Sequence, residues 1–413
     1  MIPFIQNLII KIIFILIIFE FFLQVLDFFI EKEIEKEFEK EIEKEFDSFY
    51  FFGNWKIQNP INISNNTFVN IKNYCIRKSS ISRVYSQVNN KNNKDVWDLD
   101  LFNIKYGNPN NYKKAEKIGS GKYSNVYLCE NKKYVIKELK PISLNKIKRE
   151  IKVLEILEGK NNTIKLLDVF KNEEEEEEGK NQSCLDSRYH NCTSVSLVFE
   201  YIENINYKEL YPNLTKQEIK YYMKQLLIAL DYSHSKGIMH RDVKPSNVLI
   251  DHQNHRLELC DWGLGEFYHP GKEYIVRVAT RYYKAPELLL QKKDYDYSVD
   301  MWAFGCLFAG VVFRSNAIFK GSNNSDQLVK IVEQLGFNDL DQYLIQNHLF
   351  LDSEVFEIVK YFEKKDFSPF VNEENQDIAN QNAIDLIEKL LVYDSKKRLT
   401  AREALEHQYF QEE

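Results

Sequence analysis

"IMHRDVKPSNVLI", residues 238–250, places a charged centre between two apolar ends. The centre holds Asp242, Lys244 and Asn247, at spacings of two and three residues. A carboxylate can accept a proton from a hydroxyl group, an ammonium group can neutralise a phosphate, and an amide oxygen can bind a metal ion. The full pattern, H-R-D-x-K-x-x-N, is too long to arise often by chance. It predicts a phosphoryl-transfer site, with Asp242 and Lys244 as catalytic residues and Asn247 as a metal ligand.

A second motif, "LELCDWGLGEFYHP" at residues 257–270, supplies another carboxylate. Asp261 follows an apolar run and precedes Gly263 by two residues, as in the metal-binding pattern D-F-G. We expect Asp261 to bridge Mg²⁺ to the phosphates of a nucleotide. Trp262 stands where that pattern has Phe. Its larger ring and indole N–H predict a loop that resists flipping out, and the alternative is simply a larger core residue.

A glycine-containing turn, "IGSGKYSNVY" at residues 118–127, lies between two strand-like segments. Gly119 and Gly121 would let backbone amides approach a phosphate, although Ser124 replaces the third glycine of G-x-G-x-x-G. An ordinary hairpin turn is the alternative interpretation. The candidate phosphate-loop residues are Gly119, Ser120, Gly121, Lys122, Tyr123 and Ser124.

A lysine and a glutamate upstream of the central motif are expected to form an ion pair. Lys137 ends the strand-like "YVIK", and Glu150 follows within a helical pattern over residues 144–157. The apolar stripe of that helix consists of Ile147, Ile151, Leu154 and Leu157. Glu150 lies on this stripe, and a carboxylate that faces a core needs a cationic partner. We assign that role to Lys137, which would also hold the α and β phosphates of a nucleotide.

The segment "RVATRYYKAPELL", residues 277–289, follows the D-W-G motif. Its Glu287 is expected to be buried, and Arg398 is the predicted partner because a desolvated carboxylate favours a bidentate guanidinium. Thr280 and Tyr282 resemble phosphorylation sites, but their position beside Ala285-Pro286-Glu287 favours a wall for substrate docking.

The order of patterns along the chain predicts an α+β fold. Strand-like segments come first, at residues 113–119, 125–130, 133–139, 163–170 and 195–202, interrupted by the helix over 144–157. Helical periodicity follows, for instance over residues 216–237, and residues 299–313 are apolar on all sides, as expected of a buried helix. We therefore predict a small β-rich lobe with one helix and a large α-helical lobe.

Composition limits the function classes. The chain has 413 residues, 44% of them hydrophobic, and a formal net charge of −7. Acidic residues dominate 1–46 and the run Glu173 to Glu178, and the rest of the chain is mildly basic, without the long Lys/Arg run of a nucleic-acid binder. There are 6 Cys and no C-x-x-C pair. Cys129, Cys260 and Cys306 lie in apolar stretches and are expected to be free thiols, whereas Cys184 and Cys192 would pair only in an oxidising compartment.

The start of the chain allows two interpretations. Residues 8–30 approach the length and apolarity of a membrane span, and a charged repeat continues to residue 46. Residues 1–46 are therefore either a membrane anchor or a low-complexity leader, including one from a mistaken gene start. Residues 47–81 are expected to form a polar linker.

The motifs together resemble those of eukaryotic protein kinases, and more closely those of casein kinase II catalytic subunits. The segments that carry the resemblance are "GSGKYSNV", "KIKREIKVLE", "GIMHRDVKPSNVLID", "DWGLGEFYHPGKEYIVRVATRYYKAPELL", "YDYSVDMWAFGC", "SDQLVKI" and "KRLTAREALEHQYF". With "SRVYSQVNN" and "VWDLDLF" upstream, the resemblance covers about residues 82–410. It implies a bilobal kinase fold. An N-terminal segment at 82–111 would brace the activation loop, the small lobe would span 112–202 with an acidic insertion at 172–195, and the large lobe would span 203–410.

The resemblance also implies an activity: transfer of the γ-phosphate of ATP, and of GTP as well, with Mg²⁺, to Ser or Thr in acidic contexts, without phosphorylation of the activation loop. It assigns an adenine slot lined by Val126, Val135, Leu249 and Cys260, with Phe199 as gatekeeper and Glu200 to Ile202 as hinge. Arg277, Arg281 and Lys284 match the basic pocket beside the phosphoacceptor.

The chain departs from the resembled family at two substrate-reading places. Of the lysine run before the small-lobe helix, only Lys146, Lys148 and Arg149 remain as basic candidates for reading substrate. Ser246 stands where the family has a His. We expect acidic preference immediately after the target residue to survive and more distal preference to weaken.

Partners and rival functions follow from the same resemblance. It implies acidic protein substrates and a regulatory subunit that docks on the outer face of the small lobe near the insertion. We expect the insertion at 172–195 to weaken that docking. It also implies a location in nucleus and cytoplasm, with a membrane location only if residues 8–30 are an anchor. No nucleic-acid partner is expected. The rivals are a cyclin-dependent or mitogen-activated kinase, and a pseudokinase scaffold tethered by residues 8–30.

Overall fold

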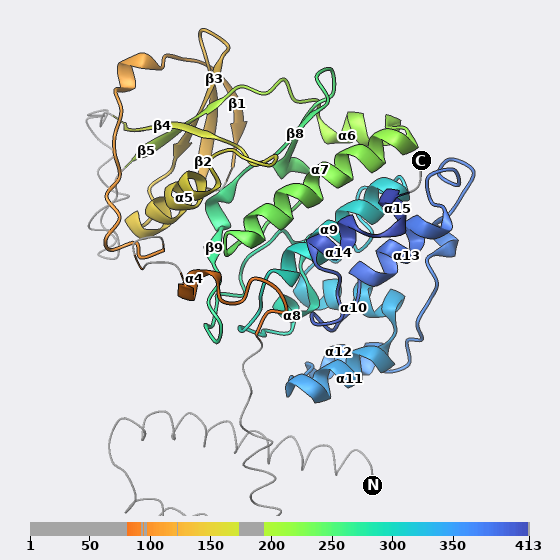
Figure 1. The fold of residues 1–413 in the computed structure, drawn as a ribbon. Coiled ribbons are helices and arrows are strands. Elements are labelled where there is room, and N and C mark those ends of the chain that lie inside the picture. The colour runs from red at the N-terminus through yellow and green to blue at the C-terminus, as the bar shows by residue number, and fades with distance from the viewer. Residues whose placement is uncertain (1–80, 92–93, 95–96, 122, 173–193, 412–413) are drawn as a thin grey trace, which may run out of the picture. The chain divides into compact units, whose positions relative to one another are not determined.

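The computed structural model of the protein describes residues 81–411, except 92–93, 95–96, 122 and 173–193 (Figure 1). All of them belong to one compact unit, Ser79–Glu413. The predictions for the leader, the linker, Lys122, the glutamate run and the Cys184–Cys192 pair lie outside the described residues. Among the residues that are described, no helix is long and apolar enough to cross a membrane.

An antiparallel five-stranded sheet forms the first lobe, in the order β1-β2-β3-β5-β4 (Figure 1). Its strands are β1 (Lys114–Ser120), β2 (Ser124–Cys129), β3 (Tyr134–Leu139), β4 (Leu166–Lys171) and β5 (Val195–Glu200). Each overlaps one of the five predicted strand-like segments, so these predictions are confirmed. Helix α5 (Leu144–Leu157) coincides with the predicted range.

The strand register assigns side chains to the two faces of the sheet. Lys137 lies opposite Val126 on one side and Leu197 on the other, and Val135 lies opposite Phe199. Because successive side chains of a strand alternate, these residues share one face. Residues of the opposite face form a separate apolar cluster, of Cys129, Ile136, Phe170 and Val198. The face that bears Lys137 belongs with α5 and the main core.

Helix α5 buries the stripe that the sequence predicted. Ile147, Ile151, Leu154 and Leu157 are all buried, and Glu150 is buried among them. The helix ends at Glu158, whose φ of 53° is left-handed. The charged residue therefore lies where the sequence predicted it, on the inward face.

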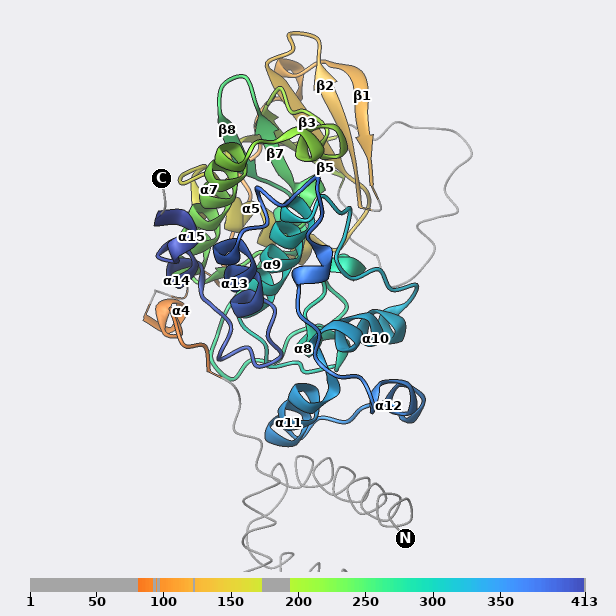
Figure 2. The ribbon, with the colours of Figure 1, turned by 90° about the vertical axis from the view of Figure 1, so that its right-hand side faces the viewer.

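The second lobe is helical and surrounds α9 (Ser298–Val312) (Figures 1 and 2). This helix is buried almost throughout, as its uniformly apolar sequence predicted. Helix α7 (Lys216–Ser235) begins at a capping box formed by Thr215 and Glu218. The remaining helices are α6 (Tyr207–Leu210), α8 (Pro286–Leu289), α10 (Asn324–Leu335), α11 (Phe337–Asn347), α12 (Ser353–Val359), α13 (Gln381–Leu390), α14 (Ala401–Leu405) and α15 (Gln408–Gln411).

Two short antiparallel ribbons lie between α7 and α8 in the sequence. Strand β6 (Ile238–Met239) pairs with β9 (Glu266–Phe267), and β7 (Val248–Asp251) pairs with β8 (Arg256–Leu259). The two predicted motifs occupy the connections of these ribbons. Residues 240–247, which carry the H-R-D-x-K-x-x-N pattern and are called the catalytic loop below, join β6 to β7, and the D-W-G motif joins β8 to β9. Pairing thus brings both motifs to one place. The predicted α+β bilobal architecture is confirmed.

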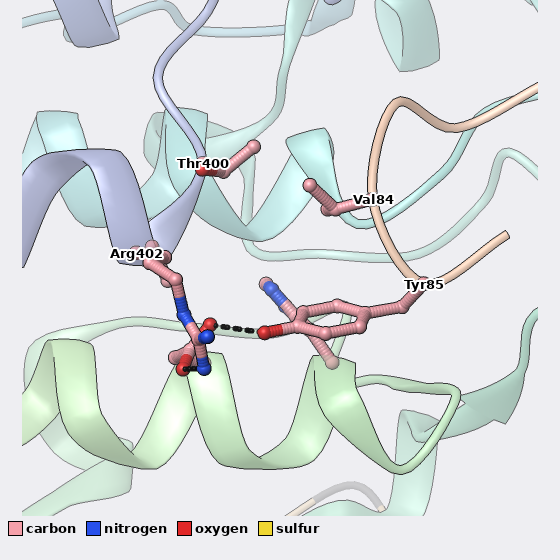
Figure 3. Close-up of a pocket in the computed structure, with 7 residues that line it drawn as sticks. Val84, Tyr85, Thr400 and Arg402 are labelled. Carbon is pink, nitrogen blue, oxygen red and sulfur yellow. Dashed lines mark hydrogen bonds and ion pairs between the residues drawn. The ribbon is translucent and has the colours of Figure 1, made fainter. Parts of the chain in front are cut away.

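The segment before the sheet, with the short helix α4 (Val88–Lys91), runs along the large lobe and reaches the activation segment, which extends from the D-W-G motif to Glu287. Figure 3 shows one of its contacts, where the Tyr85 hydroxyl donates to Asp231 at 2.8 Å beside Arg402. Further along, the Asn89 amide donates to the carbonyl of Tyr268 at 2.9 Å. The Trp97 ring then meets the His269 ring edge-on at 4.7 Å. These are contacts of the kind that the bracing prediction requires.

Candidate active site

The catalytic loop gathers its three predicted side chains around one carboxylate. Oδ2 of Asp242 accepts hydrogen bonds from Lys244 Nζ at 2.7 Å and from Asn247 Nδ2 at 3.3 Å. Its other oxygen, Oδ1, accepts from the backbone N–H and the hydroxyl of Thr280, at 2.8 and 2.9 Å. Thr280 thus connects the activation segment to the carboxylate. The sequence had assigned Thr280 to a docking wall and had not linked it to Asp242.

A buried aspartate that the sequence analysis did not single out fixes the shape of this loop. Asp300, at the start of α9, accepts from the backbone N–H groups of His240 at 2.8 Å and Arg241 at 2.7 Å. His234 contacts the same carboxylate at 2.9 Å. Arg241 has a φ of 67°, which a non-glycine residue adopts only under such constraint. A charged residue within an otherwise apolar helix was the available signal for this role.

Lys137 lies between two carboxylates. Its Nζ is 2.7 Å from Glu150 Oε1 and 2.6 Å from Asp261 Oδ1. The predicted ion pair with Glu150 is therefore present, and the lysine also joins the small lobe to the D-W-G motif. Lysine, α5 and Asp261 meet because the face of the sheet that bears Lys137 packs on α5.

The charges of Lys137, Glu150 and Asp261 shift one another's pKa values. The charge of Lys137 lowers the pKa of Asp261 to about 2. Burial alone would lower the pKa of Lys137, but the charges of Glu150 and Asp261 outweigh it and raise that pKa. Lys137 and Asp261 are consequently both charged at neutral pH, as a site for a phosphate and a metal ion requires.

Different contacts explain why a glycine suits position 263 and a tryptophan suits position 262. A Cβ atom at Gly263 would lie 3.2 Å from Glu150 Oε2 and 3.4 Å from Asp261 Oδ1, so a side chain would crowd these two carboxylates. Trp262 is buried, and its indole N–H donates to the carbonyl of Leu259 at 3.3 Å. Its ring also lies 4.5 Å from the His240 ring. The indole N–H therefore makes the hydrogen bond that the sequence suggested and anchors the motif to β8.

The donor set at Asn247 and Asp261 fits Mg²⁺. Asn247 donates its amide to the carbonyl of Asp242 at 2.9 Å, so its amide oxygen points elsewhere. The backbone carbonyl of Asn247 accepts from the N–H of Cys260 at 2.9 Å, which places Asn247 beside Asp261. One carboxylate and one amide oxygen, completed by phosphate and water, suit Mg²⁺. Among the residues that the structure describes there is no group of three or more His, Cys, Asp or Glu that would hold an ion without such completion.

The turn between β1 and β2 is a hairpin with an open backbone. The N–H of Gly121 donates to the carbonyl of Ser124 at 2.8 Å, and the Ser120 hydroxyl donates to the Asn125 side chain at 2.9 Å. A Cβ atom at Gly121 would meet only the carbonyl oxygen of Ser124, at 3.7 Å. Packing within the described chain therefore does not require glycine there, and room for a ligand is a sufficient reason. Tyr123 is half exposed.

The predicted adenine-slot residues share one pattern of burial. Val126, Val135, Phe199, Leu249 and Cys260 are all partly buried, and each but Val126 and Val135 packs against the main core. At the predicted hinge, the side chain of Glu200 pairs with Arg256 at 2.8 Å, and Ile202 is buried. Burial raises the pKa of the Cys260 thiol to about 12, so this residue acts as an apolar wall.

Two of the predicted substrate residues in the activation segment bond to backbone carbonyls. Arg281 donates to the carbonyl of Gly321 at 3.4 Å, and Lys284 donates to that of Val278 at 2.9 Å. Arg277 is exposed and has no hydrogen-bond or ion-pair partner among the described residues. Burial, with the charge of Arg281, lowers the pKa of Lys284. In the described part of the structure none of these three cations forms an ion pair with a carboxylate, although the charge of Asp242 acts on Lys284.

The three basic candidates on α5 have contacts within the chain. Lys148 donates to the carbonyl of Leu99 at 3.0 Å, and Arg149 forms an ion pair with Glu266 of β9. The ammonium of Lys146 lies 6.0 Å from the centre of the Tyr123 ring. Lys148 and Arg149 thus connect α5 to the N-terminal segment and to β9, and Lys146 is the exposed member of the three.

Comparison with known families agrees with this geometry. The family described as "Protein kinase domain" matches residues 112–410, from the start of the sheet to the last helix. That range covers well over half of the chain and includes every candidate catalytic, nucleotide and metal residue described above. The chain belongs to the protein kinase family.

Proposed function

We propose that this kinase transfers the γ-phosphate of ATP to Ser or Thr in acidic sequences, in the manner of casein kinase II catalytic subunits. The observation that carries the proposal is the basic cluster of Arg277, Arg281 and Lys284, which flanks Thr280 in the sequence and forms no ion pair with an acidic side chain among the described residues. Cations that have no ion-pair partner within the chain attract substrates that carry acidic side chains near the target residue.

The chain's own groups support each part of the reaction. Asp242 accepts the proton of the substrate hydroxyl. At the same time the hydroxyl oxygen forms a bond to the γ-phosphorus, and the bond between that phosphorus and the leaving ADP oxygen breaks. Lys244, at 2.7 Å from Asp242, neutralises charge that develops on the transferred group. Lys137 orients the α and β phosphates. Mg²⁺, held by Asn247 and Asp261, would supply further neutralisation of the phosphates when bound.

Two observations favour this proposal over its rivals. The ion pairs of Lys137 with Glu150 and Asp261 are short, which supports catalysis rather than a pseudokinase scaffold. The N-terminal segment contacts Tyr268 and His269 of the activation segment, which supports activity without loop phosphorylation. These same contacts favour a casein kinase II type over a cyclin-dependent or mitogen-activated type. Use of GTP is part of the proposal by resemblance alone.

The proposal also covers a regulatory subunit and the cellular location. The outer face of the small-lobe sheet, opposite the face that bears Lys137, is the surface where a casein kinase II regulatory subunit would dock. By the same resemblance we propose a nuclear and cytoplasmic location. Purified subunit and kinase mixed at micromolar concentration in a sedimentation experiment would test the docking, and sedimentation of the two as separate species would reject it.

A positional peptide array tests the specificity. Acid immediately after the target Ser or Thr should increase kcat/KM most, because Arg277, Arg281 and Lys284 read that position and Lys148 and Arg149 are engaged within the chain. Each charge-assisted contact is worth about 1.5–3 kcal/mol, about a 10- to 150-fold preference. The Asp242→Asn variant is the control for turnover at this site. Strongest selection at the third downstream position, or no acidic selection at all, would reject the proposal.

A further inference from the structure

One carboxylate on β9 stands among three cations from different parts of the chain. Oε2 of Glu266 pairs with Arg149 of α5 and lies 3.6 Å from Nη2 of Arg241. Its Oε1 lies 3.6 Å from Nζ of Lys272. The glutamate side chain is only 13% exposed, so water screens these charges weakly.

The two arginines are the neighbours of functional residues. Arg149 immediately precedes Glu150, and Arg241 immediately precedes Asp242. The register of the β6–β9 ribbon sets Glu266 opposite Met239, two residues before Arg241. Glu266 therefore joins α5, which holds Lys137 through Glu150, to the loop that carries the proton acceptor.

The other N–H groups of the Arg241 guanidinium have hydrogen-bond acceptors within the large lobe. Its Nε donates to the carbonyl of Leu264 at 2.7 Å, and its Nη1 donates to the Tyr295 hydroxyl at 2.9 Å. That hydroxyl in turn donates to the carbonyl of Ile275 at 2.7 Å. Arg241 is 5% exposed, and a buried cation needs a counter-charge. In the described structure Glu266 supplies the carboxylate nearest to it.

We propose that Glu266 is a positioning residue, which holds α5 and the catalytic loop together for phosphoryl transfer. It supplies from within the chain the negative charge that a phosphorylated activation segment supplies elsewhere by pairing with arginines. Without it, the guanidinium groups of Arg149 and Arg241 would repel each other, and α5 would move away with Glu150. The inference rests on the proposed phosphotransfer activity.

The test compares Glu266→Gln with a matched control, Glu273→Gln, on the full chain. Glu273 lies on the same segment, but its side chain is 64% exposed and pairs only at 3.4 Å with Lys293. Glu266→Gln should lower kcat about 10- to 100-fold with a smaller change in KM for ATP, whereas Glu273→Gln should match the wild type. Added sulfate or acetate, exchanged for chloride at constant ionic strength, should restore part of the lost kcat only in Glu266→Gln.

Hydrogen exchange of the α5 amides gives a readout that does not depend on turnover. Lower protection of the α5 amides in Glu266→Gln, with an unchanged Tm, supports the positioning role. If the wild type phosphorylates no peptide, that failure counts against the proposed function alone, and the exchange result still tests the inference. Wild-type kcat and wild-type protection in Glu266→Gln would overturn the inference. A lowered Tm without rescue by anions would also overturn it, because the residue would then be generally structural.

Discussion

Lys137 and Arg398 each pair with a buried glutamate, but their surroundings differ. Arg398 and Glu287 are 0% and 1% exposed, joined by two hydrogen bonds of 2.7 and 3.1 Å. Arg398 also donates to the carbonyls of Ser298 and Val392, at 2.8 and 2.9 Å. Lys137 is 14% exposed, and its second partner, Asp261, is 45% exposed.

The difference separates a pair that holds the fold from one that serves chemistry. The Arg398 guanidinium donates to the carboxylate of Glu287 and to backbone carbonyls on either side, so that pair has one arrangement. Lys137 shares its charge between carboxylates of two different elements, and that of Asp261 is open to solvent. A phosphate or a metal ion can therefore change the Lys137 contacts, whereas no ligand reaches Arg398. Four variants test this contrast.

The largest effect is expected from Arg398→Met. It leaves the carboxylate of Glu287 buried without its cationic partner, which costs about 3–5 kcal/mol of unfolding free energy. Urea denaturation measures the loss. Lys330→Met is the control, since Lys330 and Glu333 form an exposed pair that should be worth at most about 1 kcal/mol. Equal losses in the two variants would contradict the assignment of Arg398 to the fold.

Lys137→Met should lower turnover strongly and stability only a little, the opposite of Arg398→Met. Turnover should fall about 100-fold or more, because the phosphates lose their orienting charge. The unfolding free energy should fall by only about 1–2 kcal/mol, since burial already raises the pKa of Glu150 and the orphaned group can take up a proton. Steady-state kinetics and urea denaturation measure the two. A loss of stability as large as that of Arg398→Met would remove the contrast.

Trp262→Phe should have a smaller effect, about 1–2 kcal/mol of unfolding free energy, from a lost hydrogen bond and a small cavity. Trp302→Phe is a close control, because Trp302 is buried in α9 and its indole N–H has no acceptor among the described residues. The excess loss at Trp262 isolates the bond to Leu259. If Trp302→Phe costs as much or more, that bond does not anchor the D-W-G motif.

The smallest effect concerns pH at the bracing contact. Burial, with the charge of Lys272, lowers the pKa of His269, whose ring meets Trp97; Glu266 opposes the shift. A histidine with a lowered folded-state pKa gives its full stability above its unfolded pKa of about 6.5 and loses it as pH falls below that value. Unfolding free energy should thus decline more from pH 7.5 to 5.5 in the wild type than in His269→Phe. Parallel curves would show that His269 does not contribute.

Local motifs allowed much of the fold and site to be predicted. The five strands, α5, α7 and α9 followed from period and apolar composition, and the pairs Lys137–Glu150 and Glu287–Arg398 from the need of a buried carboxylate for a cation. The sequence analysis did not find the contacts of Thr280 with Asp242, or of Asp300 with the catalytic loop. These join residues 38 and 60 positions apart, and nothing in either local pattern specifies the partner.

Arg149 shows the division most clearly. By itself the sequence determined that a kinase-like chain carries a cation beside Glu150, and resemblance pointed to a reader of substrate. Only the tertiary structure decided that this cation faces Glu266, because the β6–β9 register and the packing of α5 together place the two side chains in contact. Sequence period sets which side of a helix a residue occupies. The partner that it meets there depends on how separate elements pack, since that packing minimises buried, unpaired charge over the whole core.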